Sequence, residues 1–191
     1  MHRFSLALAL VPVLAGPAFA DCLDELKSVA DRHKTAGAYR VEMKMTGGEN
    51  PTTITAEVVL PDRFRMTMPQ GQAVIVGDKS WMNMGGRWME IPGMGGAITG
   101  MTRQAELVSA DSALNVTCSD ADVEGRSLRL IEFDASGKPM GIDATSHVKL
   151  YLDPSTGLPA IQQIDGEAAG MKSSIVQTIT FDPSIVIEPP K

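Results

Sequence analysis

Thioether sulfur is the most concentrated side-chain chemistry in this sequence. Nine methionines lie between residues 43 and 101, and six of them form three Met-x-Met pairs. The pairs are Met43 with Met45, Met66 with Met68, and Met82 with Met84. Thioether sulfur is a soft ligand that suits copper(I), and methionine also fills cores and lines adaptable binding surfaces. Three interpretations are therefore open: a copper site, a pocket for an apolar ligand, or core filling.

Residues typical of catalysis are scarce. After the first 20 residues, the histidines are His33, which we interpret as a helix-surface residue, and His147 at the start of a strand. The sequence has neither the Gly-x-Ser-x-Gly turn of hydrolases nor the His-Glu-x-x-His motif of zinc proteases. We therefore predict that the protein is not an enzyme and has no catalytic residue, metal site or cofactor. Copper(I) binding remains an alternative.

The first 20 residues have the features of a secretory signal peptide. Arg3 precedes an apolar run, and Ala18-Phe19-Ala20 is a small-x-small cleavage signal. The apolar run is shorter than the roughly 20 residues that are needed to cross a bilayer. We therefore predict that residues 1–20 are removed and that residues 21–191 form a single exported domain in the periplasm.

Charge and cysteine content limit the partners and the compartment. The chain has 23 acidic and 17 basic residues, and its net charge of −6 opposes binding to nucleic acid. Cys22 and Cys118 are the only cysteines. An even pair in an oxidising compartment usually forms a disulfide. We expect this disulfide to join the first helix to the middle of the chain.

Two helices and many short strands are expected to position these residues. Helical spacing predicts a helix over 21–35 and a second one over about 102–114. The other segments alternate between apolar and polar residues and are separated by turns, and Gly85-Gly86 predicts a hairpin. The pattern predicts a mainly β fold with two or more helices. One face of a long antiparallel sheet would be apolar, and the helices would cover part of it and leave room for a ligand.

The expected ligand surface follows from the alternation along the strands. Residues i and i+2 of a strand share a face, so both members of a Met-x-Met pair lie on one side. Val41 and Phe64 share the faces of the first two pairs. The predicted ligand-binding residues are Val41, Met43, Met45, Val58, Leu60, Phe64, Met66, Met68, Met82, Met84 and Trp88.

Three segments carry a resemblance to a known family. PDRFRMTMPQGQAVIVGDKSWMNM, VKLYLDPSTGLPAIQQID and the closing FDPSIVIEPP resemble the periplasmic lipoprotein carrier LolA and its relatives. The resemblance implies an open antiparallel half-barrel of about eleven strands, with helices on its concave face and acyl chains bound between sheet and helices. It also implies lipid or acylated lipoprotein as cargo, and membrane-bound donor and acceptor proteins as partners.

Leu60 departs from the pattern of this family. The classical carrier has an arginine at this position, directly before the residue that matches Pro61. We therefore expect a LolA-like relative, a monomeric and non-catalytic carrier that binds a lipid-like molecule. Two other functions remain open, namely a methionine-based copper(I) protein and an interaction module that senses lipoproteins.

Overall fold

The computed structural model describes residues 18–46, 51–93, 112–138 and 142–191. These residues form one helix, α1 (Ala18–Lys34), and eleven strands. The first six strands are β1 (Ala38–Thr46), β2 (Thr52–Val59), β3 (Arg63–Met68), β4 (Gly71–Val76), β5 (Lys79–Met84) and β6 (Arg87–Glu90). The other five are β7 (Leu114–Val123), β8 (Arg126–Gly137), β9 (Ala144–Leu152), β10 (Pro159–Ala168) and β11 (Met171–Phe181).

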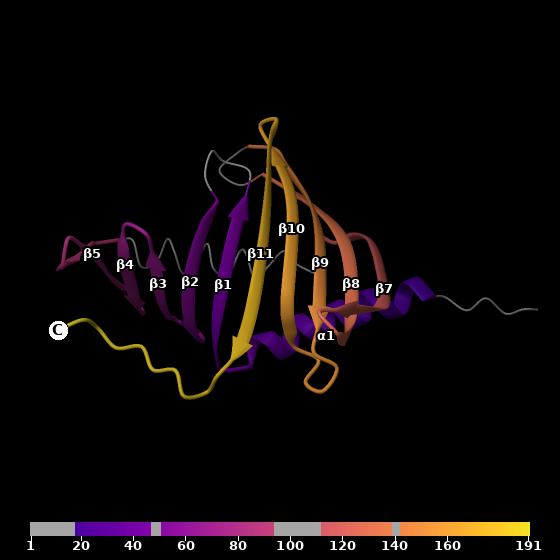
Figure 1. Ribbon diagram of the computed structural model, residues 1–191, viewed down its shortest axis with the longest axis horizontal. Coiled ribbons are helices and arrows are strands. Elements are labelled where there is room, and N and C mark those ends of the chain that lie inside the picture. Colours follow the sequence, from indigo (N-terminus) through magenta and orange to yellow (C-terminus); the bar gives the residue numbers. More distant parts are fainter. Residues whose placement is uncertain (1–17, 47–50, 94–111, 139–141) are drawn as a thin grey trace, which may run out of the picture.

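All eleven strands belong to one open antiparallel sheet. Figure 1 shows β1 and β11 side by side in the middle of this sheet. Its order is β6-β5-β4-β3-β2-β1-β11-β10-β9-β8-β7. Strands β1 to β6 and strands β7 to β11 each follow one another along the chain, and the pairing of β1 with β11 joins the two halves. The predictions of about eleven strands, of antiparallel pairing and of an open sheet are confirmed. The Gly85-Gly86 hairpin is confirmed too, because Met84 pairs with Arg87 across it.

The prediction of two or more helices is not met in the described residues, which contain one. Most of the second predicted helix, over about 102–114, lies outside these residues. Its last residue, Leu114, opens β7 and pairs with Asp134 of β8. The error at the C-terminal end of this predicted helix has a physical reason. Leu114 also begins a ten-residue strand, and pairing along β8 outweighs a helical spacing set by two distant leucines.

Helix α1 packs across one face of β7, β8 and β9 and lies behind these strands in Figure 1. The buried cluster at this contact consists of Cys22, Leu26 and Val29 from α1 and Val116, Ile131, Phe133, Ala135, Val148, Leu150 and Leu152 from the strands. The predicted disulfide between Cys22 and Cys118 joins α1 to β7. We call the face that contacts α1 the inner face of the sheet, and the opposite face the outer face.

An ion pair also holds α1 on the sheet. Arg129 of β8 donates from Nε to Glu25 Oε1 over 3.1 Å and from Nη2 to Glu25 Oε2 over 2.9 Å. Two parallel hydrogen bonds of this kind fix orientation as well as position. In the part of the chain that the structure describes, no helix combines the length and apolar character needed to cross a membrane.

The last ten residues form an extended tail that lies against the outer face. Arg63 Nη1 donates to the carbonyl oxygen of Ile187 over 2.7 Å, and Arg65 Nη2 donates to that of Val186 over 3.4 Å. These arginines alternate along β3 with Phe64, which belongs to the inner-face residues described below. Ile187 is only 1% exposed, so the tail is part of the core.

Candidate functional site

The strand register places the predicted methionines on the inner face. Val148 of β9 packs with α1 and pairs with Ile164 of β10, which pairs with Ile175 of β11. Ile175 in turn pairs with Met45 of β1. Directly paired residues have side chains on the same face of a sheet. Met45 therefore lies on the face that α1 contacts, as does Met43 two residues earlier.

The same reasoning extends to the edge of the sheet. Met43 pairs with Ile54, Ala56 with Met66, and Met82 with both Ala73 and Met89. Nine of the predicted ligand residues share the inner face: Val41, Met43, Met45, Val58, Phe64, Met66, Met68, Met82 and Met84. Leu60, just after β2, packs against the buried cluster of Tyr39, Val41, Ala56 and Val58.

Trp88 is the one predicted ligand residue that the register does not bring to this surface. It pairs with Asn83, whose neighbours Met82 and Met84 point to the inner face. Trp88 therefore lies on the outer face, together with Trp81. The inner face also carries residues that were not among those predicted, including Ile54, Met89, Ile175 and Met171. The alternation along their strands would have predicted that Ile54 and Ile175 lie on the apolar face. The face of Met89 and Met171 follows only from the strand pairing across a hairpin.

The inner-face residues differ in solvent exposure: some are buried in the core, and others are accessible at the surface. Val41 and Val58 are 7% and 5% exposed, so they belong to the core. Met45, Met84, Met89 and Met171 are instead between 37% and 72% exposed. These four methionines are more than half of the large apolar side chains found exposed in the described residues, and all of them lie on the inner face. The inner face thus offers accessible thioether side chains above a buried aliphatic base.

Helix α1 covers only one part of the inner face. Its buried residues pack with β7, β8 and β9. The cluster under the methionines has no described helical residue. The nearest approach is His33, in the last turn of α1, whose ring lies 4.9 Å from that of Tyr39 and 5.9 Å from that of Phe181. Strands β1 to β6 therefore present apolar side chains that no described helix packs against.

His33 is not the surface residue that the sequence suggested. Its ring packs against two aromatic side chains that also contact each other, and its Nε2 atom is buried without a hydrogen-bond partner in the described structure. Burial lowers the pKa of His33 below its ordinary value of 6.5, because the charged imidazolium would lose hydration there. This histidine therefore serves as an apolar contact between α1 and the sheet.

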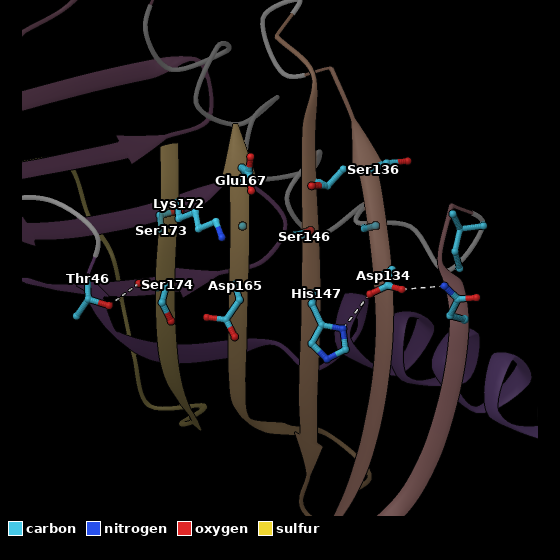
Figure 2. Close-up of a pocket in the computed structure, with 15 residues that line it drawn as sticks. Thr46, Asp134, Ser136, Ser146, His147, Asp165, Glu167, Lys172, Ser173 and Ser174 are labelled. Atoms are coloured by element: carbon cyan, nitrogen blue, oxygen red, sulfur yellow. Dashed lines mark hydrogen bonds and ion pairs between the residues drawn. The ribbon is translucent and has the colours of Figure 1, made fainter. Parts of the chain in front are cut away.

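A second candidate, a polar pocket of about 740 Å³, is made by one end of strands β8 to β11. Asp134, His147 and Asp165 form one row across three strands, as direct partners. Because Asp134 adjoins the inner-face residues Phe133 and Ala135, this row points to the outer face. Figure 2 shows the three side chains on adjacent strands, with α1 behind the sheet. The other lining residues are Thr46, Leu114, Asn115, Ala135, Ser136, Thr145, Ser146, Gly166, Glu167, Lys172, Ser173 and Ser174.

The contacts in this pocket tie its side chains to one another. Asn115 Nδ2 donates to Asp134 Oδ2 over 2.8 Å, and His147 Nδ1 lies 2.8 Å from Asp134 Oδ1. These two contacts, the one from Asn115 first, lower the pKa of Asp134 below its usual value. No residue of the predicted ligand surface lines the pocket. Within the described ranges, no group of three or more His, Cys, Asp or Glu side chains is arranged to hold a metal ion.

The fold and the site define a class of protein with one open antiparallel sheet, a single described helix disulfide-bonded to it, and an apolar, methionine-rich inner face. No protein-family model matches the sequence, and no curated protein matches it.

Among solved structures, the chain is similar to the MucA/MucB complex of Pseudomonas aeruginosa, at 14% identity over 86% of this chain and 59% of that chain, with a TM-score of 0.48. A structure of MucB alone gives 15% identity over 90% and 62%, with a TM-score of 0.45. A DUF1329 family protein from Desulfovibrio piger gives 10% identity over 90% and 96%, with a TM-score of 0.39. The chain spans about three fifths of the MucB chains. Likenesses at this level do not assign a function.

Proposed function

We propose that this protein is a non-catalytic, periplasmic binding protein that holds the acyl part of a lipid or lipoprotein on the inner face of β1 to β6. The observation that carries this proposal is the set of exposed methionines above the buried aliphatic base on that face. Exposed apolar patches mark binding sites in soluble proteins. Methionine suits a flexible acyl chain, because its unbranched side chain repacks easily around different shapes.

The sequence supports the same function independently. The resemblance of three segments to the lipoprotein carrier LolA implies an acyl ligand on a sheet of this kind, and the signal peptide implies export. Leu60, in place of the arginine of the classical carrier, packs on the buried cluster of the inner face. We therefore propose a lipid-like cargo, with lipoprotein as one member of that class.

Copper(I) binding is the runner-up, and the register counts against it. The pairs on β3 and β5 are separated by β4, whose Ala73 lies between Met66 and Met82. Two strand spacings are about 9–10 Å, so these sulfur atoms begin far apart for shared coordination. His147 also lies on the outer face, away from every methionine pair. A continuous apolar surface explains the methionine pairs without a metal.

Met68 and Thr67 provide a matched pair for a test. They are neighbours on β3 and point to opposite faces of the sheet. Met68→Glu should weaken the binding of a fluorescent fatty acid by at least about tenfold, because the bound acyl chain would displace water from the introduced carboxylate. Thr67→Glu adds the same charge to the outer face and should leave the affinity within about twofold. Equal loss in both variants would contradict the proposed surface.

A second comparison separates acyl binding from copper binding. The double variant Met66→Leu with Met68→Leu keeps the apolar area and removes two sulfur atoms. Fatty acid binding should stay within about threefold of the wild type, because leucine and methionine have similar volumes. Native mass spectrometry of the unaltered protein should show an acyl-containing mass. A copper isotope pattern that disappears in the double variant would favour the runner-up.

A further inference from the structure

Two glutamines interrupt the apolar inner face at the border between its two halves. Gln162 of β10 and Gln177 of β11 are direct cross-strand partners. Gln177 also pairs with Met43 of β1, so both glutamines lie on the inner face. Gln162 pairs on its other side with Leu150, which packs with α1. The pair therefore stands between the part that α1 covers and the part that carries the methionines.

The surroundings of Gln177 are otherwise apolar. Along β11 its inner-face neighbours are Ile175 and Ile179, and across the sheet it meets Met43 and Gln162. Both glutamine side chains are half-buried. Neither makes a side-chain hydrogen bond in the described structure. Their amide groups remain accessible, so the hydrogen-bonding groups of both side chains are available to a ligand.

A purely structural role would be a hydrogen bond between the two amides. Such a bond would use only one donor or acceptor of each group, although a primary amide has two donors and a carbonyl acceptor. Other inner-face positions in this region show that an aliphatic residue fits, since Ile164 and Ile175 form the adjacent pair of the same two strands. The spare hydrogen-bonding capacity of Gln162 and Gln177 therefore points to a ligand.

We propose that Gln162 and Gln177 bind the carbonyl group of an ester or amide at the head of the acyl chain. This inference rests on the proposed function and narrows its ligand class to molecules in which a carbonyl joins the chain to a polar head. The glutamine NH₂ groups donate to the carbonyl oxygen. A hydrogen bond of this kind rejects analogues that lack the acceptor, because a bound acyl chain would then cover the glutamine amide and leave it unpaired.

The arrangement also determines how the acyl chain is oriented on the protein. From Gln177 the row continues to Met43 on β1 and Ile54 on β2. Strands lie about 4.8 Å apart, so the path from β11 to β5 is about 24 Å, which matches the length of a long acyl chain. The carbonyl end lies beside α1, and the methyl end lies over the methionines of β3 and β5.

Two soluble detergents of equal chain length test the proposal. Decanoyl-N-methylglucamide joins its chain to the head through an amide carbonyl, and decyl glucoside joins it through a glycosidic oxygen and has no carbonyl. Both are titrated below their micelle concentrations into the full chain with its disulfide intact. Gln177→Leu and Gln162→Leu should each weaken binding of the amide detergent by about threefold to tenfold, the value of one hydrogen bond. Binding of decyl glucoside should be unchanged or tighter.

Gln163→Leu is the matched control, since Gln163 lies on β10 next to Gln162 and pairs with Val176 on the outer face. It should bind both detergents like the wild type. If Gln177→Leu and Gln162→Leu, shown to be folded by circular dichroism, bind both detergents like the wild type, the carbonyl site is contradicted and the proposed function stands. If the wild type binds neither detergent, both inferences are contradicted.

Discussion

His33 illustrates how far the surroundings of a single residue depend on distant parts of the chain. It sits in the last turn of α1 among Arg32 and Lys34, a typical exposed setting. Its ring nevertheless packs against Tyr39 and Phe181, two residues that β1 and β11 bring together. A buried histidine next to aromatic rings is favourable only while it is neutral. The residue should therefore make the stability of the protein sensitive to pH.

The pH dependence has a definite sign. The pKa of His33 is lower in the folded protein than its ordinary value of 6.5, so the unfolded chain binds the proton more readily. The contribution of neutral His33 is complete above pH 6.5 and declines as the pH falls below it. In urea unfolding, the wild type should lose more stability between pH 7.5 and pH 5 than His33→Phe does.

Two pH ranges serve as controls for this experiment. Above pH 7 the difference in stability between wild type and His33→Phe should be constant, because His33 is neutral in both states. The lowered pKa values of Asp134, Asp153 and Asp182 affect stability only toward pH 4 and below, since their usual value is 3.8. Equal losses in both proteins between pH 7.5 and pH 5 would contradict the role of His33.

At the scale of elements, α1 is the only described helix, and the disulfide joins it to β7. Cys22 and Cys118 are 96 residues apart in the sequence, so reduction frees a long loop. In the chain-entropy model a loop of about 100 residues corresponds to about 4–5 kcal/mol, and measured losses are commonly 2–5 kcal/mol. The double variant Cys22→Ser with Cys118→Ser should lower the free energy of unfolding by about 2–5 kcal/mol in urea titrations.

A reductant distinguishes the effect of the disulfide bond from the effect of replacing the two sulfur atoms. Reduced wild type should unfold at nearly the same urea concentration as the double variant. The midpoint of the variant itself should not respond to reductant. A wild-type midpoint that stays unchanged on complete reduction, verified by thiol labelling, would show that the disulfide does not stabilise the fold.

The elements also show which features a sequence can predict. Alternation within a strand is a local signal, so it places both methionines of a Met-x-Met pair on the same face of their strand. That Trp88 lies on the outer face depends on its pairing with Asn83 across a hairpin, which no local pattern shows. Leu114 was misassigned to a helix, because two leucines seven residues apart share one helical face and the pairing of Leu114 with Asp134 of β8 is not visible in the local sequence. Residues from six strands line the polar pocket, and no local sequence pattern predicts it.

At the scale of the whole molecule, the C-terminal tail closes part of the outer face. The sequence marked its prolines as the end of the fold and gave no sign that Ile187 enters the core. Its contact with β3 joins residues 124 positions apart, through Arg63 and the carbonyl oxygen of Ile187. The tail is thus a structural element, although it contains neither helix nor strand.

Ile187 and Val186 provide a neighbouring pair that tests the tail. Ile187 is 1% exposed and Val186 is 65% exposed. Ile187→Ala should lower the free energy of unfolding by about 2–4 kcal/mol, as expected for a large buried aliphatic side chain. Val186→Ala should change it by less than about 0.5 kcal/mol. Similar values for the two variants, measured by denaturant unfolding, would mean that the tail does not pack as described.

The order of the strands has a consequence for how the chain assembles. Each half of the sheet is made of consecutive strands that can pair as they are synthesised, but α1 belongs to the first half and packs on the second. The apolar residues Leu26 and Val29 of α1 therefore remain uncovered until β7, β8 and β9 have been synthesised. A chain that is synthesised from its N-terminus therefore passes through a stage in which the apolar residues of α1 are exposed to solvent. For such a protein, chaperone dependence would come from the topology rather than from weak local structure.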